Sequence, residues 1–246
     1  METESILLCA TQVSTYVGPN LLTNATGFFF QRDERLFLVS SRHVFYDEKS
    51  KHFPDRVMIT LHIDRNNATR AVDYSIPLYL DGKAQWITGA DASGDIDVAV
   101  VQIDRQRLPA EAVLEAFSAD NLLAREGSIE IGTPLLIIGF PLGFHDTLHN
   151  LPVARSAINA SSFALRFQGN GYFLTDARTH RGSSGAPVVC RNPGAAAGSL
   201  PWLLLGVHSG RLDMSGRDSE LDEALGLNCA WFADILLTLT EQRAPS

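Results

Sequence analysis

We predict an all-β protein, built as barrels or sandwiches, with helix confined to the middle and the end of the chain. Two observations support this prediction. Short apolar runs rich in β-branched and aromatic residues recur along the 246-residue chain, with Gly- and Pro-containing turns between them. Helical character is limited to one segment near residue 110 and another near residue 235. Many short strands and little helix are typical of an all-β architecture.

The first part of the chain predicts a hairpin followed by single strands. Residues 27–30 and 36–41 are apolar runs on either side of the polar segment 31–35, which is typical of two hairpin strands. Further strands are expected at residues 57–63, 76–80, 84–87 and 98–103, the last of them fully buried.

In the middle of the chain the residue pattern changes from one typical of strands to one typical of a helix. Residues 109–117 are rich in helix formers and begin with a proline, which favours a connector helix. We therefore expect an N-terminal β-barrel over residues 1–104, a connector over 105–128 and a C-terminal β-barrel over 129–246.

The last part of the chain predicts more short strands and a terminal helix. The helix is expected because five apolar residues near the C-terminus share one helical face: Trp231, Phe232, Ile235, Leu236 and Leu239. The strands are expected at residues 134–139, 164–167, 172–174, 187–190 and 203–207.

Composition limits the classes of partner. The formal net charge of −8 argues against a nucleic acid or an anionic membrane as partner, because both are bound through clustered Lys and Arg. The N-terminus is acidic, and the sequence holds neither a signal-peptide pattern nor an apolar stretch of 18 residues. We expect a cytoplasmic protein without a membrane partner. Its three cysteines are expected to be free thiols.

One segment, residues 175–189, suggests chemistry. Ser184 is flanked by Gly182, Ser183 and Gly185, and a buried strand is expected to follow. Glycine lets the backbone of such a turn approach a substrate closely. The N–H groups of Gly182 and Ser184 could then point into one small space, as an oxyanion hole requires. On its own, a serine beside glycine is more often only a turn.

Two other segments supply the groups that a nucleophilic serine needs. His43 follows the strand 36–41, and Asp97 directly precedes the buried strand 98–103, with Asp95 as a competing candidate. In isolation His43 would be a structural histidine and the aspartate a turn residue. Together with Ser184 they give the order His, Asp, Ser, in which the imidazole activates the hydroxyl and the carboxylate orients the imidazole.

With these motifs the chain resembles the chymotrypsin-fold, trypsin-like serine peptidases. It is most similar to the bacterial branch that includes HtrA-type proteases and glutamyl endopeptidases, over roughly residues 25–240. The run Asp97-Val98-Ala99-Val100 resembles the family's acid motif and favours Asp97 over Asp95. The resemblance implies two six-stranded antiparallel β-barrels with the site in the cleft between them. It also implies a serine endopeptidase that needs no cofactor and acts on protein or peptide substrates.

The sequence departs from the family pattern in a few places. Ser183 stands where Asn or Asp is usual, which argues against activation by a newly cleaved N-terminus. Ala186 replaces the second glycine after the nucleophile, and we expect no PDZ module. An α/β-hydrolase is disfavoured, because its serine lies in Gly-x-Ser-x-Gly and its triad order is Ser, Asp, His.

The resemblance also implies where the substrate side chain binds. In this family the pocket is formed by residues before the nucleophile and by the substrate-binding strand, here Arg178, Thr179, His180, His208, Ser209 and Gly210. The segment 206–210 resembles the one in glutamyl endopeptidases, and an Arg with a His would bind an acidic side chain by charge-assisted hydrogen bonds. The alternative is that Arg178 faces solvent or pairs with Asp176, and that the pocket accepts a small apolar residue.

Two further readings stay open, and one is rejected. A catalytically silent module of the same fold, used for binding or as a scaffold, and an esterase of the same fold are both alternatives to a peptidase. His145 and His149 have the i, i+4 spacing of metal ligands on a helix, but they follow a Pro-Leu-Gly loop. We therefore predict no metal site.

Overall fold

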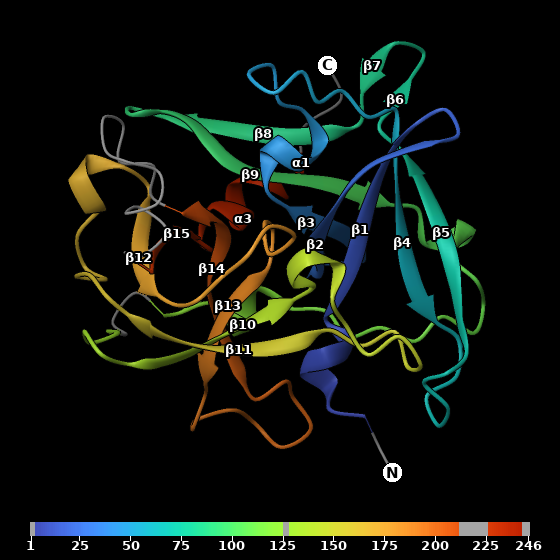
Figure 1. Ribbon diagram of the computed structural model, residues 1–246. Helices are drawn as coiled ribbons and strands as arrows, with labels where there is room; N and C mark the ends of the chain where they lie inside the picture. Colours follow the sequence, from blue (N-terminus) through green and yellow to red (C-terminus); the bar gives the residue numbers. More distant parts are fainter. Residues whose placement is uncertain (1–2, 125–127, 212–225, 243–246) are drawn as a thin grey trace.

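The computed structural model describes residues 3–124, 128–211 and 226–242 (Figure 1). Strands account for 48% of the chain and helices for 11%, so the predicted all-β class is confirmed. The strands form one open antiparallel sheet and one closed barrel, with a small extra hairpin of β6 (Tyr79–Leu80) and β7 (Lys83–Ala84). The division of the chain at residues 104 and 129 stays a prediction.

The N-terminal half forms a sheet of seven strands rather than the expected six. The order is β5-β4-β1-β2-β3-β9-β8. Its central hairpin consists of β2 and β3, which are consecutive in the sequence and pair with each other. Both strands contain apolar runs whose side chains are buried. The strands are β1 (Ala10–Val17), β2 (Asn20–Arg32), β3 (Arg35–Ser40), β4 (Arg56–His62), β5 (Ala71–Pro77), β8 (Trp86–Asp91) and β9 (Gly94–Ile103).

The C-terminal half forms a closed six-stranded barrel, as expected. The strand order in the barrel is β10-β11-β12-β15-β14-β13. Strands β14 and β15, the last two in the sequence, lie between β12 and β13 and so close the barrel. The strands are β10 (Pro134–Gly139), β11 (Val153–Asn159), β12 (Tyr172–Asp176), β13 (Pro187–Arg191), β14 (Trp202–Arg211) and β15 (Leu227–Phe232).

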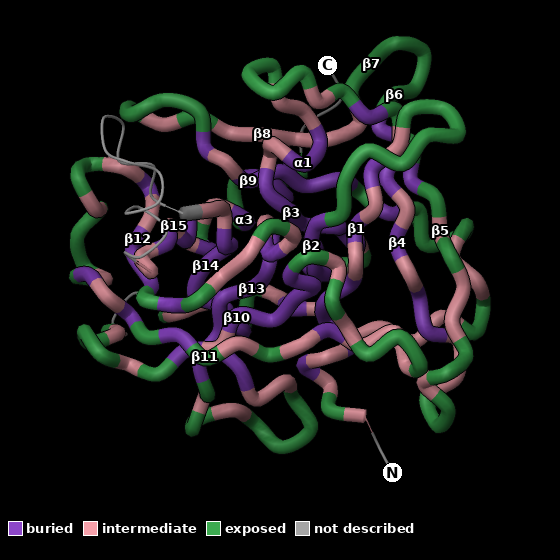
Figure 2. Tube along the Cα trace, in the orientation of Figure 1, coloured by how far each residue is buried: buried purple, intermediate pink, exposed green. Residues whose placement is uncertain are grey.

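The core joins the two halves. Its largest apolar cluster combines Phe28 and Phe30 of the sheet with Ile138, Val189 and Leu204 of the barrel. Two further clusters lie within the sheet and within the barrel. Buried segments are accordingly concentrated in the middle of the molecule (Figure 2). The packed contact between the halves fixes the relative position of residues that are far apart in the sequence.

The connector helix predicted for residues 109–117 is wrong. The described part of the connector has only the short 3-10 helices Arg105–Arg107 and Ala119–Asn121. Phe117 instead forms a bridge to Phe30 and is fully buried, with its ring edge-on to Phe28. Burial of this apolar segment against the sheet outweighs its helix propensity.

The sequence also misplaced or missed several strands. Residues 164–167 are not a strand, and Phe167–Gly169 forms a short 3-10 turn. Strands β1 and β11 were not predicted, because their apolar residues are interrupted by Thr, Ser, Arg and Asn. The strand at 57–63 is confirmed as β4, and the one at 98–103 as the second part of β9.

The terminal helix is confirmed but is shorter than the apolar pattern predicts. Helix α3 spans Ile235–Leu239, and Leu236 and Leu239 are buried. Trp231 and Phe232 belong to strand β15 instead of the helix. Within the described residues, we find no helix with the length and apolar character needed to cross a membrane.

Candidate active site

The sheet register brings His43 and Asp97 together. Strand β3 pairs with β9 so that Ser40 lies opposite Ala99, and the short helix α1 (Arg42–Phe45) begins two residues after Ser40. Asp97 lies two residues before Ala99 on β9. His43, in the first turn of α1, therefore lies directly beside Asp97.

Asp97 accepts hydrogen bonds from three donors. His43 Nδ1 lies 2.7 Å from Asp97 Oδ2, and the backbone N–H of His43 donates to Oδ1 at 2.9 Å. The Ser209 hydroxyl donates to Oδ2 at 2.5 Å. Burial raises the pKa of the Asp97 carboxyl, but the hydrogen bond and the charge of His43 outweigh this and hold the pKa below its usual value. Asp97 is therefore ionised at neutral pH.

The carboxylate of Asp97 acts on the imidazole in return. Burial lowers the pKa of His43, whereas the hydrogen bond and charge of Asp97 raise it, and the net result is a pKa above the usual 6.5. Asp95, the competing acid, pairs with Arg42 at 3.1 Å instead. Among the described contacts, His43 therefore pairs with Asp97 and not with Asp95.

Ser184 lies in a turn between β12 and β13 that requires glycine. Gly182 and Gly185 have φ values of +90° and +85°. A Cβ on Gly185 would collide with the backbone oxygen of Thr26, and a Cβ on Gly182 would lie 2.6 Å from the carbonyl oxygen of Phe140. Only glycine fits a backbone of this shape at such close approach.

Thr26 ties this turn to the N-terminal half. Its N–H donates to the Ser184 carbonyl at 3.0 Å, and its hydroxyl donates to the Gly182 carbonyl at 2.8 Å. The same hydroxyl accepts the N–H of Phe140 at 3.0 Å. Thr26 is fully buried, so these bonds are shielded from water.

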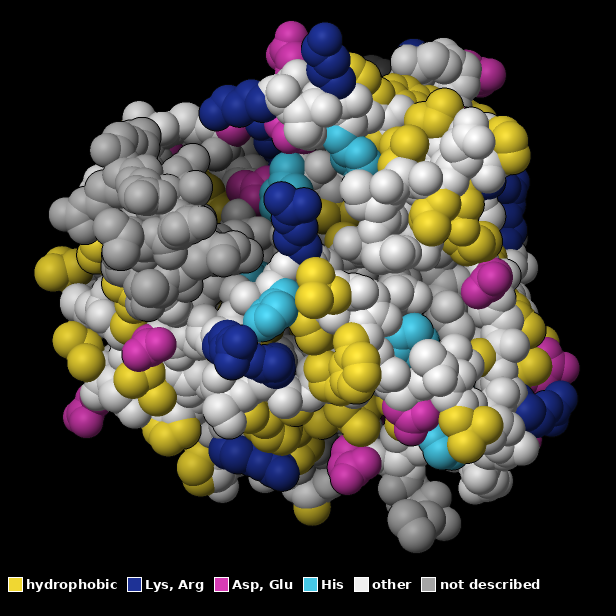
Figure 3. Space-filling view, in the orientation of Figure 1, with side chains coloured by type: hydrophobic (Ala, Val, Ile, Leu, Met, Phe, Trp, Pro, Cys, Tyr) yellow, Lys and Arg dark blue, Asp and Glu magenta, His cyan; other side chains and the backbone are white. Residues whose placement is uncertain are grey.

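Ser184 and His43 line one cleft of about 690 Å³. It opens on the face drawn in Figure 3, where histidine, Lys or Arg, and hydrophobic side chains gather near the centre. The Ser184 hydroxyl donates to the Ser209 carbonyl at 3.0 Å. Among the hydrogen bonds of the described residues, none joins Ser184 Oγ to His43 Nε2.

Two of the four backbone N–H groups from Gly182 to Gly185 have no acceptor among the described residues. Ser183 and Gly185 donate to the carbonyls of His180 and His208, whereas Gly182 and Ser184 donate to no other described residue. The Arg181 carbonyl accepts the N–H of Leu142 at 2.5 Å. In a trans peptide the C=O and the following N–H point in opposite directions, so the Gly182 N–H points away from Leu142.

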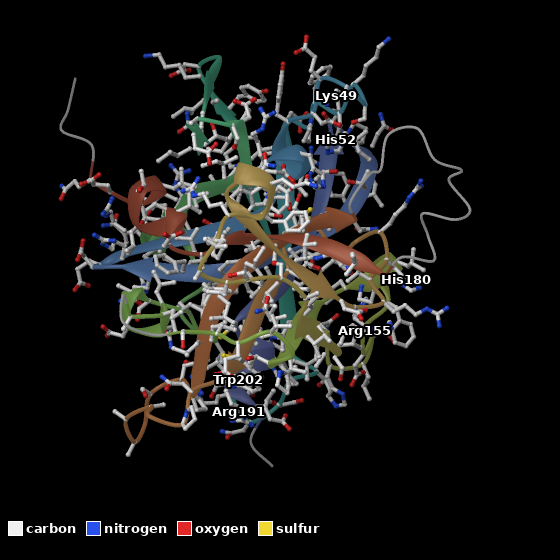
Figure 4. All side chains as sticks on the ribbon, turned by 90° about the vertical axis from the view of Figure 1, so that its left-hand side faces the viewer. Lys49, His52, Arg155, His180, Arg191 and Trp202 are labelled. Carbon is white, nitrogen blue, oxygen red and sulfur yellow. The ribbon has the colours of Figure 1, made fainter. Side chains whose placement is uncertain are left out.

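The expected pocket residues before the nucleophile occupy different environments. Arg178 is exposed, and its carbonyl accepts a hydrogen bond from Arg155 at 2.7 Å. Thr179 donates its hydroxyl to Asn228 Oδ1 at 2.5 Å. His180 is half-buried, and its Nδ1 is buried without a described partner; Figure 4 places it on the same side of the molecule as Arg155. The alternative pairing of Arg178 with Asp176 is not among the ion pairs of the described residues.

His208, on β14, is the most deeply buried of these candidates. Its side chain is enclosed, and its Nδ1 has no partner among the described residues. Its carbonyl accepts the N–H of Gly185 at 2.7 Å and the hydroxyl of Ser41 at 3.2 Å. Burial, and next the charge of His43, lower the pKa of His208 to about 4. Ser209 and Gly210 follow it on β14, and residues 212–225 lie outside the described part of the chain.

Comparison with known proteins assigns the chain to a family. The sequence model of the trypsin-like peptidase domain matches residues 25–198, which include His43, Asp97 and Ser184. The chain belongs to the trypsin-like peptidase family. The family predicted from the sequence motifs, that of the trypsin-like serine peptidases, is thereby confirmed. The protein is a serine endopeptidase.

Two solved structures have the same fold as this peptidase. The active form of the Rv3671c protease from M. tuberculosis matches with a TM-score of 0.52 at 15% identity, covering 98% of this chain and 84% of that one. The serine endoprotease from Yersinia pestis matches with a TM-score of 0.54 at 16% identity, covering 94% of this chain and 61% of that one. At these identities the likeness concerns the fold. A search of curated proteins finds no match.

Sequence reasoning missed several residues that shape this peptidase site. Thr26 was not singled out, although its position directly before Gly27 in the strand leading to the histidine was the available signal. Ser209 was expected only to bind substrate, and its hydroxyl also holds Asp97. Asn228 was missed because its role depends on folding: its side-chain amide donates to the carbonyls of Ala177 and Gly226.

The two histidines at metal-like spacing are engaged within their own loop. His145 Nδ1 lies 2.6 Å from the Gly143 carbonyl oxygen, and His149 Nδ1 lies 2.7 Å from Asp146 Oδ2. No group of three metal-ligating side chains occurs in the described ranges.

Proposed function

We propose that this peptidase hydrolyses peptide bonds through an acyl-enzyme, with Ser184 as nucleophile, His43 as general base and Asp97 as the orienting acid. The observation that supports this most is the contact of His43 Nδ1 with Asp97, on the edge of a cleft that also holds Ser184. That contact fixes the tautomer in which Nε2 is free to accept a proton.

In the proposed acylation step, Ser184 Oγ attacks the scissile carbonyl carbon while its proton passes to His43 Nε2. The ionised Asp97 stabilises the imidazolium that forms. The tetrahedral intermediate then collapses: the C–N bond breaks, and His43 gives its proton to the leaving amine. Water next attacks the acyl-enzyme with His43 again as base, which releases the acid and restores Ser184.

The proposed oxyanion hole consists of the N–H groups of Gly182 and Ser184. Support comes from their lack of other acceptors among the described residues, and from the hydrogen bond of the Arg181 carbonyl to Leu142. Two donors held by a packed turn would stabilise the negative oxygen without reorganising during the reaction.

A fluorophosphonate probe tests the nucleophile. We expect the probe to label wild-type protein at Ser184, as mapped by peptide mass spectrometry, and to leave Ser184→Ala unlabelled. A catalytically silent scaffold would not be labelled at all. Matched peptide and ester substrates then separate a peptidase from an esterase, because the latter would cleave only the ester.

We further propose that the pocket for the residue before the scissile bond prefers Glu or Asp. Buried polar atoms are normally hydrogen-bonded, so the unpartnered Nδ1 of His208 and that of His180 favour a ligand with acceptor oxygens. Since its pKa is about 4, His208 is neutral at pH 7 and would bind the carboxylate as an N–H donor. Thr179, Ser209 and Gly210 complete the proposed pocket, with Arg178 at its exposed side.

Digestion of a peptide library tests this preference. We expect cleavage mainly after Glu and Asp. Cleavage mainly after Ala, Val or Leu would show instead that the pocket takes small apolar side chains.

A further inference from the structure

The cleft that holds His43 and Ser184 extends well beyond them, over the β1–β2 hairpin and the turn Pro141–Gly143. Lining residues on this side include Leu21, Leu22, Leu142 and Arg181. None of the candidate pocket residues 178–180 and 208–210 lines it in the described part of the chain. This part of the cleft is therefore separate from the proposed acidic pocket.

A bulge in β2 places two consecutive leucines in the cleft. Thr15 of β1 lies opposite Thr23, and the next residue, Tyr16, lies opposite Leu21, so Leu22 has no partner on β1. Successive side chains of a regular strand face opposite sides, and a bulge next to an active site redirects one of them. Leu21 and Leu22 both line the cleft and are 52% and 40% exposed.

Leu142 adds a third exposed leucine from the opposite wall. It is 69% exposed and has a φ of 56° and a ψ of 22°, a left-handed conformation that favours glycine. An exposed leucine side chain gains little from burial, and the left-handed backbone of a non-glycine residue costs free energy. Non-glycine residues in this conformation concentrate at functional sites.

The edge of β2 in the cleft is open to an extended chain. Strand β3 pairs with β2 only from Phe28 to Arg32. Residues 20–25 pair with β1 on one edge and with no described strand on the other. An unpaired strand edge is a template for an extended peptide, whose alternate side chains then contact the neighbouring pockets.

The chemistry identifies which part of the substrate would lie there. His43 must deliver a proton to the leaving amine, so the leaving segment lies on the His43 side of Ser184, where this cleft runs. We propose that the cleft binds the leaving segment of the substrate, and that Leu21, Leu22 and Leu142 select an apolar side chain within its first two residues. This inference rests on the proposed function, since Ser184 fixes the position of the scissile bond.

Matched peptides test the preference. Two peptides share every residue up to the scissile bond and differ in having Leu-Leu or Ser-Ser after it. We expect wild-type kcat/KM to be about tenfold higher for the Leu-Leu peptide. Half-burial of its two apolar side chains in the cleft would stabilise the bound peptide by about this factor. Leu22→Thr and Leu142→Asn should reduce this ratio to about twofold; Asn is chosen because it tolerates positive φ. Leu148→Asn is the matched control, an exposed leucine that does not line the cleft.

Acyl transfer separates the inference from the proposed function. An ester forms the acyl-enzyme, and added leucinamide or serinamide then competes with water for it. We expect leucinamide to capture several-fold more product than serinamide in the wild type, and this advantage to be smaller in Leu142→Asn. If the wild-type acyl-enzyme reacted equally well with the two amides while ester turnover stayed normal, the proposed apolar preference of the cleft would be wrong. The proposed function of Ser184 would be unaffected. Turnover that persists in Ser184→Ala would instead overturn the proposed function.

Discussion

At the residue scale, the proposed mechanism depends on the electrostatic balance between Asp97 and His43. The carboxylate lies in a shielded position, yet three hydrogen-bond donors keep it ionised. Its charge in turn raises the pKa of an imidazole that burial alone would lower. A general base with a raised pKa is protonated, and hence inactive, over a wider range of acid pH.

Asp97→Asn tests this balance through pH dependence. The free enzyme needs neutral His43, so kcat/KM of the wild type should rise as pH increases through a value above 6.5. The substitution removes the charge of Asp97 and weakens its hydrogen bond, the two largest influences that raise the pKa of His43, and leaves burial, which lowers it. We therefore expect the rising limb to move to lower pH, with kcat lowered about 10³–10⁴-fold.

Measurement of kcat/KM from pH 5 to pH 9 would reveal the shift. Ser209→Ala serves for comparison, because it removes one neutral donor and leaves the charge of Asp97 in place. A rising limb that stays at the wild-type pH in Asp97→Asn would contradict the proposed influence of Asp97.

At the scale of elements, the connector shows how packing decides local structure. Its sequence favours a helix, but Phe117 pairs with the edge of β2 at Phe30 and fills space within the sheet. The N–H of Phe117 donates to the Phe29 carbonyl at 3.0 Å, and its own carbonyl accepts the N–H of Gln31 at 2.7 Å. The extended segment makes these bonds and buries the ring of Phe117 completely.

Phe117→Ala should therefore destabilise the protein by about 3–5 kcal/mol, as removal of a buried aromatic ring leaves a cavity. Urea unfolding followed by tryptophan fluorescence measures the effect. Glu111→Ala, an exposed position of the same segment, should change stability by less than about 0.5 kcal/mol. If the two variants lost similar stability, the connector would not be anchored by Phe117.

Prediction from the sequence succeeded where apolar runs are continuous. The hairpin of β2 and β3 and strand β10 were found for this reason. Strands β1 and β11 were missed because polar residues interrupt their apolar pattern, and their pairing partners are what stabilise them. Local propensity holds no information about such partners.

At the scale of the whole molecule, the site is assembled across the two halves. His43 and Asp97 come from the N-terminal sheet and Ser184 from the C-terminal barrel. The order of the motifs suggested this assembly, and their resemblance to one family made it specific. The hydrogen bond between Thr26 and Gly182 joins residues that are 156 positions apart in the sequence, so no local sequence pattern could indicate it.

Thr26→Val tests how far this contact between the halves positions the nucleophile. The substitution keeps the shape of the side chain and removes the hydroxyl, which leaves the buried N–H of Phe140 and the Gly182 carbonyl unsatisfied. We expect a loss of about 1–3 kcal/mol of stability and a fall in kcat with a smaller change in KM. Thr238→Val, at an exposed position on α3, is the control and should resemble the wild type. Unchanged kcat and stability in Thr26→Val would refute the role of Thr26.

The central claim is that Ser184 is the nucleophile of a peptidase. The most direct measurement is kcat for one cleavable peptide with wild-type protein and with Ser184→Ala, after circular dichroism has shown both to be folded. We predict a loss of about 10⁵–10⁶-fold, which leaves only residual turnover. Peptide cleavage by Ser184→Ala at a rate close to that of the wild type would contradict the account.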